Sequence, residues 1–207
     1  MNFLAKSEWR TPAGLVALTA IPALAGIVRL VVLAHGATIT PENARFFAAP
    51  LPVAVHIVGA SLFCLLGAFQ FSAPFRRRRP DWHRISGRIL VPCGLAAGLS
   101  GLWMTQFYPL PGGLQGPLLY GVRLLVGSGM VLSILLSLAA ILRGDIAPHR
   151  AWMMRAYALG QGAGTQAVIL LPITLLLASP IGLTRDLLMT LGWVVNLAAA
   201  EWILRRH

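Results

Sequence analysis

Residues 118–142 read LLYGVRLLVGSGMVLSILLSLAAIL, an apolar run with a single charged residue, Arg123. A helix needs about 20 mostly apolar residues to cross the hydrocarbon core of a bilayer, and this run is long enough. Five other stretches meet the same test. The six predicted spans cover residues 13–34, 51–71, 88–107, 118–142, 151–177 and 183–204. Because the connections between them are short, we expect one integral membrane domain over residues 1–207.

The composition of the whole chain supports a membrane location. Of its 207 residues, 57% are hydrophobic and 11% are charged, whereas soluble domains carry about 25% charged residues. Such a chain cannot cover a folded surface in water, and it is too hydrophobic to be disordered. The net charge of +11 does not indicate nucleic-acid binding, because the basic residues lie between apolar runs. Alternation with a period of two is absent, so we expect an all-α fold in which spans two to five form a four-helix core with flanking helices.

Lysine and arginine fall unevenly on the two sides of the predicted spans. With the N-terminus in the cytoplasm, thirteen of the 17 lie inside and four lie outside. The inner set is Lys6, Arg10, Arg76, Arg77, Arg78, Arg79, Arg84, Arg88, Arg143, Arg150, Arg155, Arg205 and Arg206, and the outer set is Arg29, Arg45, Arg123 and Arg185. Cytoplasmic loops of membrane proteins carry the excess of basic residues. We therefore expect both termini in the cytoplasm, and the short loops and high ratio of Arg to Lys favour a bacterial inner membrane.

Two His-Arg pairs stand at the cytoplasmic starts of the third and fifth helices. These pairs are His83-Arg84 and His149-Arg150. If the two helices are neighbours, the imidazoles lie at one depth and can face each other. Two imidazoles from facing helices can supply both axial ligands of a haem iron. The sequence therefore permits one b-type haem here, with Gly87 leaving room for the macrocycle.

The residues around this histidine pair allow more than one kind of site. Four arginines could bind the haem propionates by charge-assisted hydrogen bonds: Arg84, Arg88, Arg150 and Arg155. The His-Arg pairs could instead mark the interface and bind lipid phosphate. The two histidines, His83 and His149, could also join two carboxylates as ligands of zinc, iron or manganese. These carboxylates are Asp81 and Asp145, which could equally cap the helices.

A second group of polar residues lies on the outer side. His56 in the second span, Arg29 in the first and Arg123 in the fourth sit at similar depths. If their helices are adjacent, they form a polar layer suited to an anionic group, a quinone carbonyl or a haem propionate. Ionisable residues inside a membrane are costly, which makes such a layer a functional hypothesis. The alternative is that both arginines snorkel to the head groups and His56 is a hydrogen-bonded core residue.

The motifs around the histidines resemble those of domain-of-unknown-function family 2306, a group of predicted bacterial membrane proteins. The first motif has His56, GAFQF at 67–71 and HRxxGR at 83–88, and the second has RGD at 143–145 and HRxWMxR at 149–155. The resemblance covers about residues 50–175, and the family implies no established activity.

The arrangement is more distantly similar to the b-561 type of transmembrane two-haem cytochromes, which place histidines on four successive helices. This likeness implies that His83 and His149 match one ligand pair and that His56 matches half of the other. Arg123 stands where the fourth histidine would be. The likeness therefore leaves one complete ligand pair.

These observations lead to three hypotheses from different classes. The leading one is a redox protein that holds one haem b and exchanges electrons with a quinol or a cytoplasmic donor. The second is a protein that binds or transports a lipid or small amphiphile, using the outer layer and the polar fifth span, in which Gln161 and Thr165 share a face. The third is a structural membrane subunit. Nucleotide-binding and hydrolase motifs are absent from the sequence, so ATP-driven and hydrolytic chemistry have no support.

Overall fold

The computed structural model of the protein describes residues 3–206 and describes side chains from Trp9 onward, so the Lys6 side chain lies outside the described residues. This part of the chain is helical and contains no strand. Its helices are α1 (Phe3–His35), α2 (Ala44–Ala48), α3 (Pro50–Ala68), α4 (Ala73–Arg78), α5 (Pro80–Phe107), α6 (Pro117–Leu142), α7 (Ile146–Gly160), α8 (Gly162–Leu176) and α9 (Gly182–Arg205). A short 3-10 helix, η1 (Phe69–Phe71), continues α3.

Six helical segments among the described residues are long and apolar enough to cross a membrane. They are Trp9–His35, Pro50–Phe71, Pro80–Phe107, Pro117–Leu142, Ile146–Leu176 and Gly182–Arg205. The all-α fold with six candidate spans is therefore confirmed. The third begins at Pro80 rather than at 88, because a proline is well tolerated in the first turn of a helix. His83 and His149 consequently lie in the first turns of α5 and α7, as the His-Arg pairs predict.

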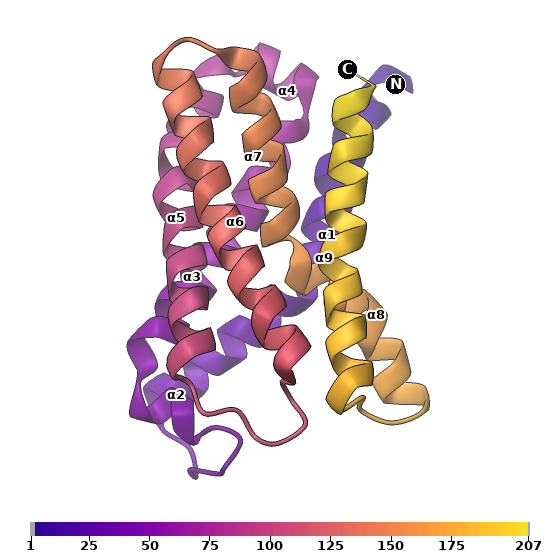
Figure 1. Ribbon diagram of the computed structural model, residues 1–207. Helices are drawn as coiled ribbons and strands as arrows, with labels where there is room; N and C mark the ends of the chain where they lie inside the picture. The colour runs from indigo at the N-terminus through magenta and orange to yellow at the C-terminus, as the bar shows by residue number, and fades with distance from the viewer. Residues whose placement is uncertain (1–2, 207) are drawn as a thin grey trace.

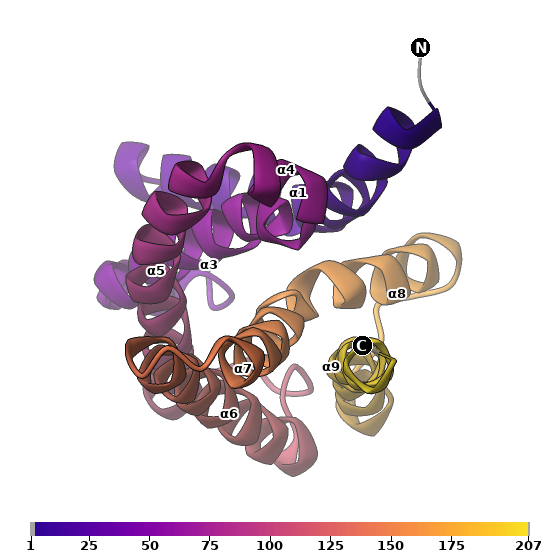
Figure 2. The ribbon, with the colours of Figure 1, turned by 90° about the horizontal axis from the view of Figure 1, so that it is seen from above.

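Four helices enclose the hydrophobic core. α3 packs against α5, α5 against α6 and α6 against α7, and α7 closes the ring against α3 (Figures 1 and 2). Each contributes a large side chain to the centre: Phe63, Leu90, Ile134 and Tyr157. The predicted four-helix core of spans two to five is thus confirmed. Outside it, α1 packs against α3 and α8, and α9 packs against α7 and α8.

The two ends of the bundle differ in charge. The start of α1, the end of α9, α4 and the turn between α6 and α7 lie at one end, and α2 lies at the other (Figure 1). We call the first the arginine-rich end, because it holds three consecutive arginines of α4, at 76–78, and both His-Arg pairs. We call the other the α2 end. The two ends therefore reproduce the grouping of basic residues found in the sequence.

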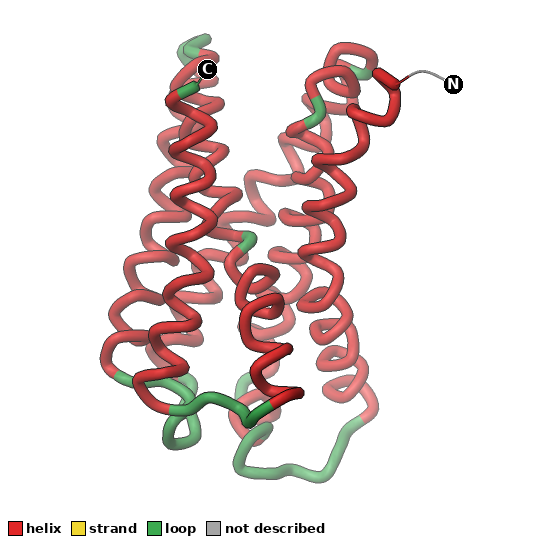
Figure 3. Tube along the Cα trace, turned by 90° about the vertical axis from the view of Figure 1, so that its right-hand side faces the viewer, coloured by secondary structure: helices red, strands yellow, loops and turns green. Residues whose placement is uncertain are grey.

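The fifth span is interrupted at Gln161, between α7 and α8 (Figure 3). The side chain of Gln161 is 3% exposed. Its amide nitrogen lies within hydrogen-bond distance of Tyr157 Oη (2.9 Å), Thr19 Oγ1 (3.0 Å) and the Leu15 carbonyl (3.2 Å). Polar groups in the hydrocarbon region must be satisfied within the protein. The side chain at the interruption is therefore fully bonded within the protein, and two of its bonds connect the α7–α8 junction to α1.

A carboxylate joins α6 and α9 at the α2 end. Asp186 of α9 is 1% exposed and accepts hydrogen bonds from the backbone amides of Gly116 (3.0 Å) and Leu119 (3.1 Å). The first amides of a helix lack partners within the helix, and a negative charge there also complements the helix dipole. Asp186 therefore caps α6 from a neighbouring helix.

We expect Asp186→Ala to lower the free energy of unfolding by about 1–3 kcal/mol, because two amides at the start of α6 lose their acceptor. Thermal denaturation of the purified protein in detergent measures the change. Asp145→Ala is the matched control: Asp145 is 51% exposed and pairs with Arg143 at 3.2 Å, so its loss should cost less than about 1 kcal/mol. Equal losses from the two substitutions would contradict the role given to Asp186.

Candidate functional site

A cavity of about 380 Å³ reaches from the α2 end into the bundle, and we call it the α2-end cavity. Its lining comes from α2, α3, α5, α6, α7, α8 and α9. The polar side chains in the lining include Arg45, His56, Thr105, Tyr108, Arg123 and Gln166, and the large apolar ones include Phe63, Met130, Leu159 and Trp193. None of the described residues in this lining is Asp or Glu. The cavity therefore combines an apolar body with cationic side chains, in the size range of small-molecule sites.

Arg45 projects from α2 toward this cavity. Its Nη1 atom is buried and has no hydrogen-bond partner. The guanidinium stacks on the ring of Phe46 at 4.4 Å, and Arg29 of α1 stacks on the same ring, also at 4.4 Å. Burial, followed by the charge of Arg29, lowers the pKa of Arg45. A cation is thus held beside the cavity with one donor left unused.

Arg123 of α6 contributes a second cation to the lining. Its Nη1 atom donates a hydrogen bond to Oε1 of Gln115, in the connection between α5 and α6. This bond holds the guanidinium at the α2 end of the cavity. The neighbouring carboxylate, Asp186, is occupied by the backbone of α6.

His56 of α3 is held by α5. Its Nδ1 atom lies 2.9 Å from the carbonyl oxygen of Ala97 and 3.3 Å from Oγ of Ser100. A carbonyl oxygen can only accept a hydrogen bond, so the proton is on Nδ1 and, in the neutral ring, the lone pair is on Nε2. Within the described part of the chain, Nε2 has no hydrogen-bond partner. His56 therefore brings an unused acceptor to the cavity lining.

The predicted layer of His56, Arg29 and Arg123 is assembled in part. His56 and Arg123 line one cavity, whereas Arg29 is outside the lining and supports Phe46. Arg45 takes the place expected of Arg29. In the sequence, Arg45 stands out only as one of the four basic residues on the arginine-poor side. The signal that could have found it is its position, because an arginine is unexpected on the arginine-poor side of a membrane protein.

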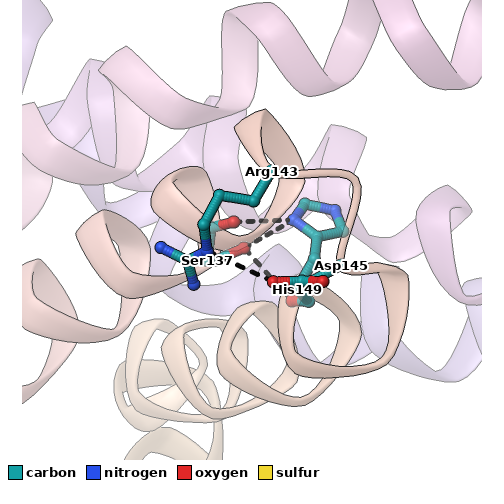
Figure 4. Close-up of polar contacts among 4 residues, drawn as sticks. All are labelled: Ser137, Arg143, Asp145 and His149. Carbon is teal, nitrogen blue, oxygen red and sulfur yellow. Dashed lines mark hydrogen bonds and ion pairs between the residues drawn. The ribbon is translucent and has the colours of Figure 1, made fainter.

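His149 lies at the arginine-rich end with its ring fixed by α6. Its Nδ1 atom is 2.8 Å from Oγ of Ser137 and 3.1 Å from the Ser137 carbonyl, and the Ser137 hydroxyl also donates to the His149 carbonyl at 3.1 Å (Figure 4). The carbonyl again requires the proton on Nδ1. Nε2 of His149 is therefore the nitrogen available to a ligand, which is the usual arrangement of a metal-bound imidazole.

His83 lies in the same region, on α5. Its Nδ1 atom is buried and has no hydrogen-bond partner. Its helix, α5, and the helix of His149, α7, are diagonal members of the four-helix core. A Cβ atom added at Gly87 would meet nothing within 4 Å, so space exists beside this residue.

The four arginines predicted to bind propionates differ in their surroundings. Arg84, Arg88 and Arg150 are exposed. Arg155 instead binds Glu201 of α9, with Nε–Oε1 at 2.5 Å and Nη2–Oε2 at 3.1 Å, and it stacks on Trp152. Arg155 is therefore engaged in joining α7 to α9 and is not free for a propionate.

The alternative metal site is not assembled. The described residues contain no group of three or more His, Cys, Asp or Glu that could hold a metal ion. Asp145 turns to Arg143 rather than to His149 (Figure 4). The expectation that Asp81 and Asp145 join His83 and His149 around one ion is therefore not met by this arrangement.

The fold and the polar groups inside it define a polytopic α-helical membrane protein. The chain belongs to the family described as "Predicted membrane protein (DUF2306)", whose model matches residues 53–204. The family resemblance seen in the sequence is confirmed, and His56, His83, Arg123 and His149 all lie in the matched region. No curated protein and no solved structure matches the chain.

Proposed function

We propose that this protein binds a small amphiphile with an acidic head group in the α2-end cavity. The observation that carries the proposal is Nη1 of Arg45, a buried guanidinium donor without a partner beside that cavity. A buried donor without an acceptor costs stability. An anionic oxygen in the cavity would supply the acceptor and form a strong, charge-assisted hydrogen bond.

The rest of the lining supports the same kind of ligand. Arg123 adds a second cation, and the absence of carboxylates from the described lining leaves both charges available to an anion. Phe63, Met130 and Trp193 offer an apolar surface for a hydrocarbon body. Burial of that body contributes about 25 cal/mol for each Å² removed from water.

A second candidate function is electron transfer through one haem b between His83 and His149. The observation that favours it is the state of the imidazole nitrogens: Nε2 of His149 is left free by Ser137, and Nδ1 of His83 is buried without a partner. The two histidines would hold the iron, and Arg84, Arg88 and Arg150 would face the propionates. The haem would supply one-electron chemistry with a quinol or cytoplasmic donor.

We further propose that the protein is a bacterial inner-membrane protein with both termini in the cytoplasm. The support is the concentration of arginine at the end that carries the termini, since basic residues collect on the cytoplasmic side. In this orientation the α2-end cavity lies in the outer leaflet.

The orientation predicts which loops are reached from outside the cell. In a protein with Cys64 and Cys93 replaced by Ala, we expect Thr38→Cys, between α1 and α2, to react with a membrane-impermeant maleimide in intact cells. Asp145→Cys, in the turn between α6 and α7, should react only after permeabilisation. Both positions are exposed. The reverse pattern would overturn the proposed orientation.

The amphiphile proposal predicts that charge in the cavity controls affinity. We expect oleate to bind the purified protein in a nonionic detergent at least about tenfold more tightly than oleyl alcohol, since hydrogen bonds to charged groups contribute about 1.5–3 kcal/mol. Arg45→Met should weaken this preference, because it removes one of the two cations in the cavity lining and leaves Arg123.

The control for this titration is Arg88→Met, which removes an exposed arginine at the other end of the bundle. Binding is measured by calorimetry. Equal affinity for the acid and the alcohol, or equal loss in Arg45→Met and Arg88→Met, would refute acidic head-group binding in the cavity.

The haem proposal predicts a Soret band in protein purified from cells supplied with a haem precursor. His83→Ala and His149→Ala should each abolish it, because each removes one axial ligand, whereas His56→Ala should retain it as the control. An absorption spectrum decides the matter. A wild-type protein without the band, or a band that survives both ligand substitutions, would exclude this candidate.

A further inference from the structure

We propose that the head group recognised in the α2-end cavity is a phosphate monoester, bound as an anion whose remaining hydroxyl donates to Nε2 of His56. This inference rests on the proposed function and names the class of its ligand. Its basis is the juxtaposition, in one lining, of two guanidinium donors and one imidazole acceptor.

The acceptor is defined by how α5 holds His56. Its Nδ1–H is directed to the Ala97 carbonyl (2.9 Å) and Ser100 Oγ (3.3 Å). The Ser100 hydroxyl is itself a donor to the Ala96 carbonyl at 2.5 Å, so its oxygen is free to accept from the imidazole. A charged imidazolium is unfavourable in a buried membrane site, and the Ala97 carbonyl holds the proton on Nδ1, so we take the ring as neutral with Nε2 as an acceptor. A head group that satisfies His56 must therefore carry a hydrogen-bond donor.

The donors are defined by the two arginines. Arg45 has an unused Nη1 donor, and Arg123 faces the same cavity while Gln115 holds it. Guanidinium groups donate and never accept. A head group that satisfies them must present oxygen acceptors, and with no carboxylate in the described lining a negative charge is favoured.

Few simple head groups meet both requirements at once. An ionised carboxylate has acceptors but no donor, and a protonated one has a donor but no charge. A phosphodiester has a charge but no hydroxyl on phosphorus, and a quinol has hydroxyls without a charge. A phosphate monoester as the monoanion has three terminal oxygens, one of which is protonated, and can therefore serve Arg45, Arg123 and His56 together.

The test compares two amphiphiles that differ by one hydroxyl. Oleyl phosphate and oleyl methyl phosphate carry the same single negative charge at about pH 5, because the second pKa of a phosphate monoester is near 6. We expect calorimetry in nonionic detergent to show about tenfold tighter binding of the monoester to the wild-type protein. The preference should disappear in His56→Phe. It should persist in His35→Phe, the matched control, because His35 is exposed and lies outside the cavity lining.

The outcomes separate this inference from the proposed function. Equal binding of the two phosphates, or a preference that persists in His56→Phe, would overturn the assignment of the hydroxyl to His56 and leave acidic amphiphile binding intact. If neither phosphate binds more tightly than oleyl alcohol, the proposed function fails as well. Inorganic phosphate at the same concentration should not displace oleyl phosphate, because it lacks the apolar body. Displacement would assign the site to a soluble phosphate and refute an amphiphile.

Discussion

Hydrogen-bonding groups buried in the protein have no water to bind, so each needs a partner inside the protein. Gln161 meets this constraint by bonding across to α1, and Asp186 meets it for the first amides of α6. Among the described residues, the buried side-chain atoms that lack a partner are Nη1 of Arg45 and Nδ1 of His83. One lies at the α2-end cavity and the other on α5 at the arginine-rich end. The two exceptions thus coincide with the two places where a ligand is proposed.

The two proposed sites hold a histidine in the same way but differ in where their arginines lie. His56 and His149 both direct Nδ1–H to a backbone carbonyl and a serine hydroxyl of a neighbouring helix, which leaves Nε2 unused in each ring. At the α2 end, the arginines line the cavity itself. At the arginine-rich end, Arg84, Arg88 and Arg150 lie exposed on the surface of the protein. The two ends therefore differ in whether their arginines line a cavity or lie on the protein surface.

The spans, the four-helix core and the first-turn positions of the histidines follow from apolar run length and from local motifs, so they could be predicted from the sequence. The presence of Arg45 rather than Arg29 in the cavity lining could not be predicted, because it depends on how α2 places Phe46 in contact with both guanidiniums. The pairing of Arg155 with Glu201 likewise depends on α9 packing against α7. A local sequence pattern indicates how far along a span a residue lies. Side-chain contacts between helices depend in addition on which helices pack together.

The ring of Phe46 connects α1 to the α2-end cavity. It stacks on Arg29 from the long first helix and on Arg45 beside the cavity, at equal distances of 4.4 Å. Two like charges are thereby kept on one aromatic group, and each constrains the position of the other. A shift of α1 along the bilayer normal would therefore alter the electrostatic potential inside the cavity. The first helix, although peripheral to the core, therefore reaches the cavity lining through Phe46.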